Sequence, residues 1–189
     1  LATARGQYEE AESLLVRVLM IQQLAYEDDA PEIASTLDSL ATIYNGQGLI
    51  SKAISLFKRV LKIREKGMGK NHASVAETSL NLASALRAAG QIEEAEKALT
   101  RALAILEKKL DNTHPMIATV LNNLAGLYEN QGKFEKAEPL YHKALKSRET
   151  TLGFDHPEVA ISLNDLGGLY WAQGHFTKAE PLYRRAISI

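Results

Sequence analysis

Residues Val120 to Ala144, VLNNLAGLYENQGKFEKAEPLYHKA, decide the fold of this chain. Apolar residues stand at helical spacing on both sides of a glycine, which predicts two helices joined by a tight turn. That glycine returns with a period of 42 residues, as Gly6, Gly48, Gly90, Gly132 and Gly174. A fixed period of this length is the signature of a solenoid built from repeated helix pairs.

The period divides the 189 residues into about 4.5 units, so we expect an all-α solenoid of antiparallel helix pairs. We expect one continuous domain over residues 1–189, with a partial unit at 1–30 and a truncated last unit at 157–189. The full units between them should span about 31–72, 73–114 and 115–156. Because the chain begins and stops inside helices of this pattern, we expect the natural protein to continue in both directions.

Each unit has signals for where its two helices begin. The first helix should start near Pro31, Ala73, Pro115 or Pro157, because proline suits a first helical turn and a capping residue type stands just upstream. The second helix should follow the turn glycine, which needs a left-handed backbone. An alanine five residues after each turn glycine should let the two helices pack closely. In the partial unit, this pattern predicts a turn at Gly6 and a second helix from Tyr8.

Composition and motifs narrow the function. The net charge is −1 without a basic run, which argues against a nucleic-acid partner. Without an apolar stretch of about 20 residues we expect no membrane span, and without a visible signal peptide we expect a cytoplasmic protein. The absence of cysteine excludes disulfides and thiol chemistry. Without a phosphate loop, nucleophile elbow or zinc-protease motif, we expect no enzyme and no cofactor.

One histidine per unit recurs just before the first helix, at His72, His114 and His156. Packed helices lie about 8–10 Å apart, whereas zinc ligands must lie within about 2.0–2.3 Å of one ion. We therefore expect these histidines to pack in the loops and expect no metal site.

The pattern resembles the tetratricopeptide repeat. The residues that carry the resemblance are Leu121, Leu124, Ala125, Tyr128, Gly132, Phe134, Ala137, Tyr141 and Ala144. The usual unit has about 34 residues, and the longer unit here is similar to those of kinesin light chains and of many bacterial signalling proteins. The resemblance implies a right-handed superhelix whose concave face, lined by the first helices, holds a peptide or a protein segment.

The family's binding positions can be transferred to the first helix of each unit. The candidate ligand-binding residues are Asp38, Ser39, Asn45, Asn81, Arg87, Asn122, Asn123, Glu129, Asn164, Asp165 and Trp171. An asparagine amide both donates and accepts, so it can hold an extended peptide backbone. Gly126 and Gly168 would let a ligand chain approach closely. Trp171 is either an aromatic anchor for a ligand or a contact for a following unit.

The charge of this face matches neither the chaperone-binding members of the family nor the cargo-binding light chains. Asp38 stands where a clamp for a terminal carboxylate would need a lysine. Arg64 and Arg148 could give a light-chain-like basic groove, but acidic residues oppose them. We therefore expect a protein-interaction scaffold that binds a protein or peptide ligand. The alternatives are a structural solenoid that associates end to end, and a regulatory repeat domain of a larger signalling protein.

Overall fold

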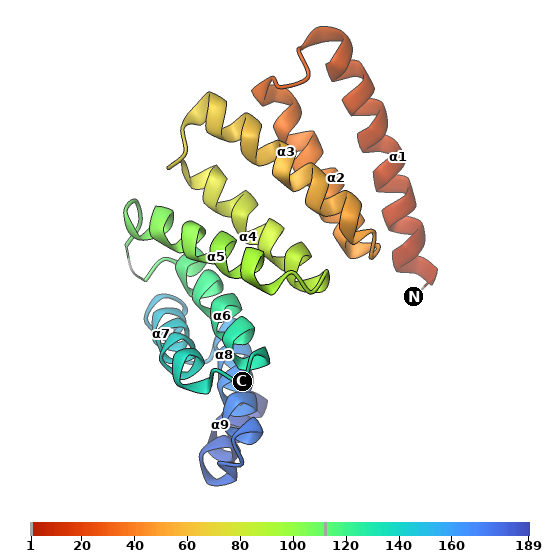
Figure 1. The fold of residues 1–189 in the computed structure, drawn as a ribbon. Coiled ribbons are helices and arrows are strands. Elements are labelled where there is room, and N and C mark those ends of the chain that lie inside the picture. Colours follow the sequence, from red (N-terminus) through yellow and green to blue (C-terminus); the bar gives the residue numbers. More distant parts are fainter. Residues whose placement is uncertain (1, 112) are drawn as a thin grey trace. The chain divides into compact units, whose positions relative to one another are not determined.

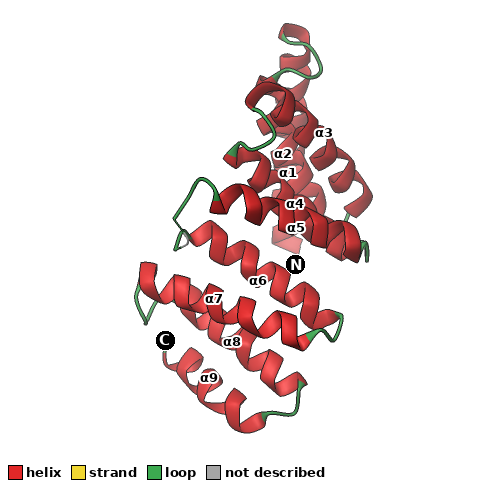
Figure 2. Ribbon diagram, turned by 60° about the vertical axis from the view of Figure 1, so that its left-hand side comes forward, coloured by secondary structure: helices red, strands yellow, loops and turns green. Residues whose placement is uncertain are grey.

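The protein is described by a computed structural model that covers residues 2–111 and 113–189, with side chains for residues 8–111 and 113–189. Over these residues the chain consists of helices and loops only (Figure 2). The helices are α1 (Ala2–Ala25), α2 (Pro31–Gly46), α3 (Ile50–Met68), α4 (Ala73–Ala88), α5 (Ile92–Glu107), α6 (Pro115–Asn130), α7 (Phe134–Leu152), α8 (Pro157–Ala172) and α9 (Phe176–Ser188). The predicted all-α class is confirmed.

The helices group into two compact units, Leu1–Ile105 and Leu106–Ile189. In the first unit α1 packs on α2, α2 on α3 and α3 on α4, and in the second α6 packs on α7, α7 on α8 and α8 on α9 (Figure 1). Consecutive helices therefore stack as the helix-pair repeat predicts. One continuous solenoid over residues 1–189 and its right-handed coil remain predictions.

Each first helix ends in the same hydrogen-bonded turn. After α2, the Leu49 N–H donates to the Tyr44 carbonyl at 2.8 Å and the Gly48 N–H donates to the Asn45 carbonyl at 3.1 Å. These two bonds satisfy carbonyl groups that the helix end would otherwise leave unpaired. The pattern requires a positive φ, which is 78° at Gly48 and 69–75° at the three later turn glycines. The predicted left-handed turn is confirmed there.

The prediction for the first turn glycine was wrong. Helix α1 runs from Ala2 to Ala25 without a break at Gly6. The few residues before Gly6 amount to little more than one helical turn, which is too short to form a helix that could pack back on its neighbour. Continuing the helix instead gives their backbone groups intrahelical hydrogen bonds. The expectation that residue Leu1 belongs to a first helix lies outside the described residues.

The helix starts are confirmed at Pro31, Ala73, Pro115 and Pro157. Three of these starts are capped by the recurring histidines. The Nδ1 atoms of His72, His114 and His156 accept hydrogen bonds of 3.3, 3.2 and 3.1 Å from the backbone N–H two residues later. The histidines therefore do more than pack in the loops, because each satisfies a free donor of a helix start.

The core of each unit lies between its stacked helices. Ala53, Ala95, Ala137 and Ala179 are at most 1% exposed, which confirms the close helix contact predicted from their spacing. In the first unit Ile33 and Leu37 of α2 pack against Ile63 of α3. Two repeats later, the position of Ile63 holds Ser147.

Candidate functional site

The predicted binding residues of the second unit lie on the neighbouring helices α6 and α8. The Asn122 amide donates to the Asp165 carboxylate at 2.6 Å and joins the two helices. The Asn123 amide donates to the Thr119 carbonyl of its own helix at 2.8 Å. One N–H of each amide is therefore engaged inside the protein, and the binding role of both residues stays a prediction.

In the first unit the corresponding residue Asp38 also forms an internal bond. Its carboxylate lies 3.1 Å from the Arg64 guanidinium of α3, and both side chains are mostly buried. Burial raises the pKa of Asp38, and the charge of Glu77 adds to this shift, whereas Arg64 and the Asn81 amide oppose it. Of the remaining first-unit candidates, Ser39 donates to the Ser35 carbonyl at 3.0 Å.

The two arginines considered for a basic groove lie between helices instead. Arg64 donates to the Ser74 carbonyl at 3.1 Å and to the Thr78 hydroxyl of α4. Arg148, one of the most buried charged residues at 6% exposure, donates to the Ser162 hydroxyl of α8 at 2.5 Å. Both guanidinium groups considered from the sequence for a basic groove are thus bonded within the protein. A signal in the sequence could have shown it, because each arginine stands 14 residues before its hydroxyl partner.

Helix α8 presents a row of exposed side chains on one face. Ile161 is 51% exposed and Trp171 is 60% exposed, and Asn164 between them is also exposed. The spacing of these residues and the half-buried Gly168 is that of a single helical face. Sequence reasoning missed Ile161, although it stands three residues before Asn164 on the same face.

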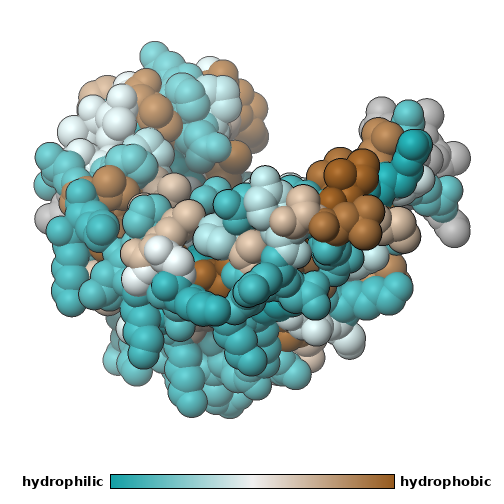
Figure 3. All heavy atoms as spheres, turned by 90° about the horizontal axis from the view of Figure 1, so that it is seen from above, coloured by the Kyte–Doolittle hydropathy of each residue, from teal (hydrophilic) through white to brown (hydrophobic). Residues whose placement is uncertain are grey.

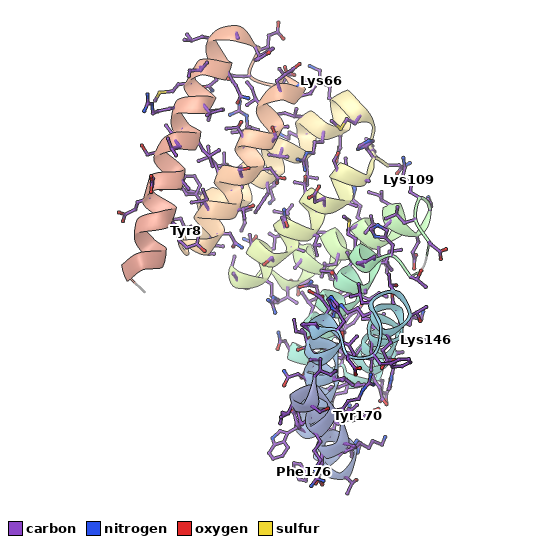
Figure 4. The ribbon with its side chains drawn as sticks, turned by 180° about the vertical axis from the view of Figure 1, so that it is seen from behind. Tyr8, Lys66, Lys109, Lys146, Tyr170 and Phe176 are labelled. Carbon is purple, nitrogen blue, oxygen red and sulfur yellow. The ribbon has the colours of Figure 1, made fainter. Side chains whose placement is uncertain are left out.

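Trp171 is held by its neighbour Phe176 at the start of α9. The two rings meet edge to face with centroids 4.7 Å apart and planes at 66°. Figure 4 shows Phe176 at this end of the unit, below Tyr170 of α8. Edge-to-face aromatic pairs are favourable, so the indole has a support and still exposes most of its surface. This arrangement is suited to an aromatic contact with another molecule.

The other candidates have more limited roles. Arg87 is exposed and Asn45 is half-buried. Glu129 accepts a hydrogen bond of 2.7 Å from the Tyr141 hydroxyl. A Cβ atom added to Gly126 would lie 3.3 Å from that same hydroxyl. This glycine therefore makes room for a tyrosine of the following helix, in place of the ligand chain that the sequence suggested.

A tyrosine of α8 is bonded to a glutamate of α7. The Tyr170 hydroxyl donates to Glu138 Oε1 at 2.7 Å, and His142 Nε2 lies 3.2 Å from the same hydroxyl. Burial, together with the bond to and the charge of Glu138, raises the pKa of Tyr170 to about 12. In the first unit, burial and Glu12 of α1 raise the pKa of the corresponding Tyr44. These contacts connect consecutive helices.

Among the residues that the structure describes, no three His, Cys, Asp or Glu side chains are grouped so that they could hold a metal ion. No helix in the described part of the chain is both long and apolar enough to cross a membrane.

Comparison with known proteins identifies the class. The tetratricopeptide repeat family matches residues 1–66, 52–108 and 116–189. The chain belongs to this family, and it is a repeat scaffold of the protein-interaction class. A comparison with the curated proteins finds no match.

Solved structures of similar fold include kinesin-light-chain-type repeats. The chain is 29% identical to a kinesin-light-chain-type protein of Podosopora anserina with nearly identical TPR-like repeats, with a TM-score of 0.81 over 98% of this chain and 88% of that one. It is 26% identical to BtubC (BKLC) of P. vanneervenii, with a TM-score of 0.86 over 98% and 74% of the two chains. A Rap protein complexed with competence and sporulation factor shares the fold at 20% identity, with a TM-score of 0.74 over 97% and 51%.

Proposed function

We propose that the chain is a non-enzymatic scaffold that binds an extended peptide or a segment of a partner protein along the exposed face of α8. The observation that carries this proposal is the row formed by Ile161, Asn164 and Trp171, in which two large apolar side chains are more than half exposed. Such exposure on a face that also presents a polar amide is typical of an interaction surface.

The chemistry of this row suits an extended ligand. Trp171 and Ile161 would contact apolar side chains of the ligand, and tryptophan is enriched among the residues that dominate binding energy. Asn164 can donate to and accept from a peptide backbone without requiring a particular ligand sequence. The paired side chains Asn122 and Asp165 would position α6 beside α8 and would not themselves bind the ligand backbone.

The experiment compares three forms of the protein in capture of partners from a lysate. One carries Asn164→Ala and Trp171→Ala, and the control carries Met68→Ala, which removes an apolar side chain that is 48% exposed at the end of α3. We expect the α8 variant to lose at least one partner that the wild type and the control retain. Identical captures by all three forms would refute the proposal.

Trp171 also provides a direct readout, because it is the only tryptophan of the chain. A partner segment, made as a synthetic peptide, should shift the emission of Trp171 to shorter wavelength as it covers the indole. Binding without any change in this emission would place the site elsewhere on the protein.

A second candidate function is end-to-end self-association. Helix α1 exposes Leu14, Val18, Ile21 and Leu24 at 42–91%, and hydrophobic side chains are visible on the α1 side of the molecule in Figure 3. Ile187 of α9 is 85% exposed. If copies stack through these surfaces, Val18→Glu or Ile187→Glu should convert an assembly to monomers in sedimentation velocity. A wild-type chain that is monomeric at all concentrations would exclude this alternative.

A further inference from the structure

The second unit contains a hollow of about 320 Å³ between the start of α6 and the second half of α7. Ile117 and Leu121 of α6 form its apolar side, and Ser147 of α7 lies opposite them. Exposed residues complete the lining. They are Glu107, Lys143, Lys146 and Thr150, together with the half-buried Thr113. Figure 4 shows Lys146 at the surface of α7.

The hollow arises where α7 departs from the repeat. The position of Ser147 is held by Ile63 and Ile105 in the two preceding 42-residue repeats, and both isoleucines are at most 3% exposed. In the first unit Ile63 fills the space against Ile33 and Leu37. A serine is too short to do this, and its own environment is unsuitable for a hydroxyl. Ser147 is 6% exposed, and its hydroxyl has no hydrogen-bond partner among the described residues.

A second departure opens the rim of the same hollow. Consecutive second helices are joined by the ion pairs Glu65–Arg101 at 2.7 Å and Glu149–Arg185 at 2.5 Å. The corresponding residues between these pairs are Glu107 and Lys143, and no ion pair joins them within 4.0 Å in the described structure. Two changes from the repeat, an isoleucine to a serine and an arginine to a lysine, therefore meet at one place.

We propose that this hollow binds a small carboxylate with a short apolar chain. The chain would lie on Ile117 and Leu121, and the carboxylate would face α7. Lys143 and Ser147 are four residues apart and so share one face of that helix. A carboxylate beside Lys143 would be paired with the lysine ammonium, at the edge of the space that the short Ser147 side chain leaves unfilled.

Charge and size both favour this class of ligand. Two lysines against one glutamate give the rim a net positive charge, which favours an anion over a cation or a neutral molecule. A volume of about 320 Å³ is at the small end of the range of roughly 300–1,000 Å³ for ligand sites. The site is separate from the exposed face of α8, so the proposal does not depend on the proposed function.

The test is an NMR titration of the whole chain with hexanoate, and with 1-hexanol as the uncharged match. We expect saturable shifts of backbone amides in residues 113–121 and 143–150 with hexanoate, and at least ten-fold weaker binding of hexanol. Ser147→Ile restores the side chain of the earlier units and should abolish the shifts. Lys58→Gln, which changes an exposed lysine of α3, should leave them unchanged.

Three results would overturn the proposal. The first is the lack of a saturable shift with hexanoate, and the second is an equal response of Ser147→Ile and the wild type. The third is equal affinity for hexanoate and hexanol, which would refute the role of the charged rim. If Ser147→Ile does not fold, Lys143→Arg replaces it, because an arginine that pairs with Glu107 should close the rim and weaken binding at least five-fold.

Discussion

The buried pair Arg148 and Ser162 allows a quantitative test of how consecutive helix pairs are joined. Ser162 is fully buried and its hydroxyl accepts a hydrogen bond of 2.5 Å from Arg148. Arg148 Nε also lies 3.2 Å from the half-exposed carboxylate of Glu158. The same two positions one period earlier hold Leu106 and Val120, and both of these are fully buried. The chain thus holds a polar pair of residues in one repeat and an apolar pair at the same two positions of the repeat before it.

We predict that changing both residues to the apolar solution is nearly neutral, whereas changing either one alone is not. Ser162→Val removes a hydrogen bond to a charged group, which contributes about 1.5–3 kcal/mol. Arg148→Leu leaves the Ser162 hydroxyl buried without a partner, at about 1–3 kcal/mol. In the double variant neither polar group remains, so its free energy of unfolding should lie within about 1 kcal/mol of the wild type, because buried pairs can often be replaced by packed apolar residues.

The assay is urea unfolding of the wild type, both single variants and the double variant, with the m-value checked in each. The two single losses add to about 2.5–6 kcal/mol and the double variant should lose at most about 1 kcal/mol, so we expect a coupling energy of at least about 1.5 kcal/mol between the two sites. Arg184→Leu is the control, because its ion pair with Glu180 is exposed and should contribute less than about 0.5 kcal/mol. A double variant whose destabilisation equals the sum of the two single variants would refute the reasoning.

Two further predictions follow from the caps and the tyrosine contact. His156→Ala should lower the free energy of unfolding by about 1 kcal/mol because α8 loses its cap, whereas His156→Asn should retain most of the stability, and equal urea midpoints for the two variants would contradict the capping role. Tyr170 has a raised pKa in the folded chain, so its contribution is complete below pH 10 and is lost as the pH rises from 10 to about 12. The stability of Tyr170→Phe should therefore fall less steeply than that of the wild type over this range in pH-dependent urea unfolding, and parallel curves would exclude the effect.

Much of the fold could be predicted because the same sequence signals recur in each 42-residue repeat. The turn glycine recurs every 42 residues and a proline begins three of the four first helices, so a signal that is weak in one repeat becomes strong over several. The turn predicted at Gly6 does not form, because one of the two helices that the repeat needs around it is missing. A turn of this kind is stabilised by the two helices that pack across it, and the sequence pattern at Gly6 marks the turn without supplying the first of those helices.

The binding residues were harder to predict because position in the repeat does not say which side chains are engaged. Asn122 and Asn164 stand at corresponding positions, and the structure shows the Asn122 amide bonded to the Asp165 carboxylate of the following first helix, α8. Sequence spacing within one unit cannot show such a partner 43 residues away. Comparing pairs of positions between units would have indicated it, since Asp38 and Asn81 hold the same two positions with acid and amide exchanged.

Paired exchanges of this kind change residue types between repeats while the arrangement of the helices stays the same. Tyr44 and Tyr170 each interact with a glutamate of the preceding helix, whereas the two corresponding positions between them hold the apolar residues Leu86 and Ile54. Changes that come in matched pairs preserve helix packing, because no buried polar group is left without a partner.

Changes without a matching partner therefore deserve a different interpretation. Ile161 and Trp171 expose apolar surface with no compensating change on a neighbouring helix, and Ser147 leaves a buried hydroxyl unpaired. The corresponding positions one period earlier hold Glu129 for Trp171 and Ile105 for Ser147, so the repeat itself does not require these residues. All three lie in the unit Leu106–Ile189. The proposed binding face of α8 and the proposed ligand site beside Ser147 therefore both belong to this unit.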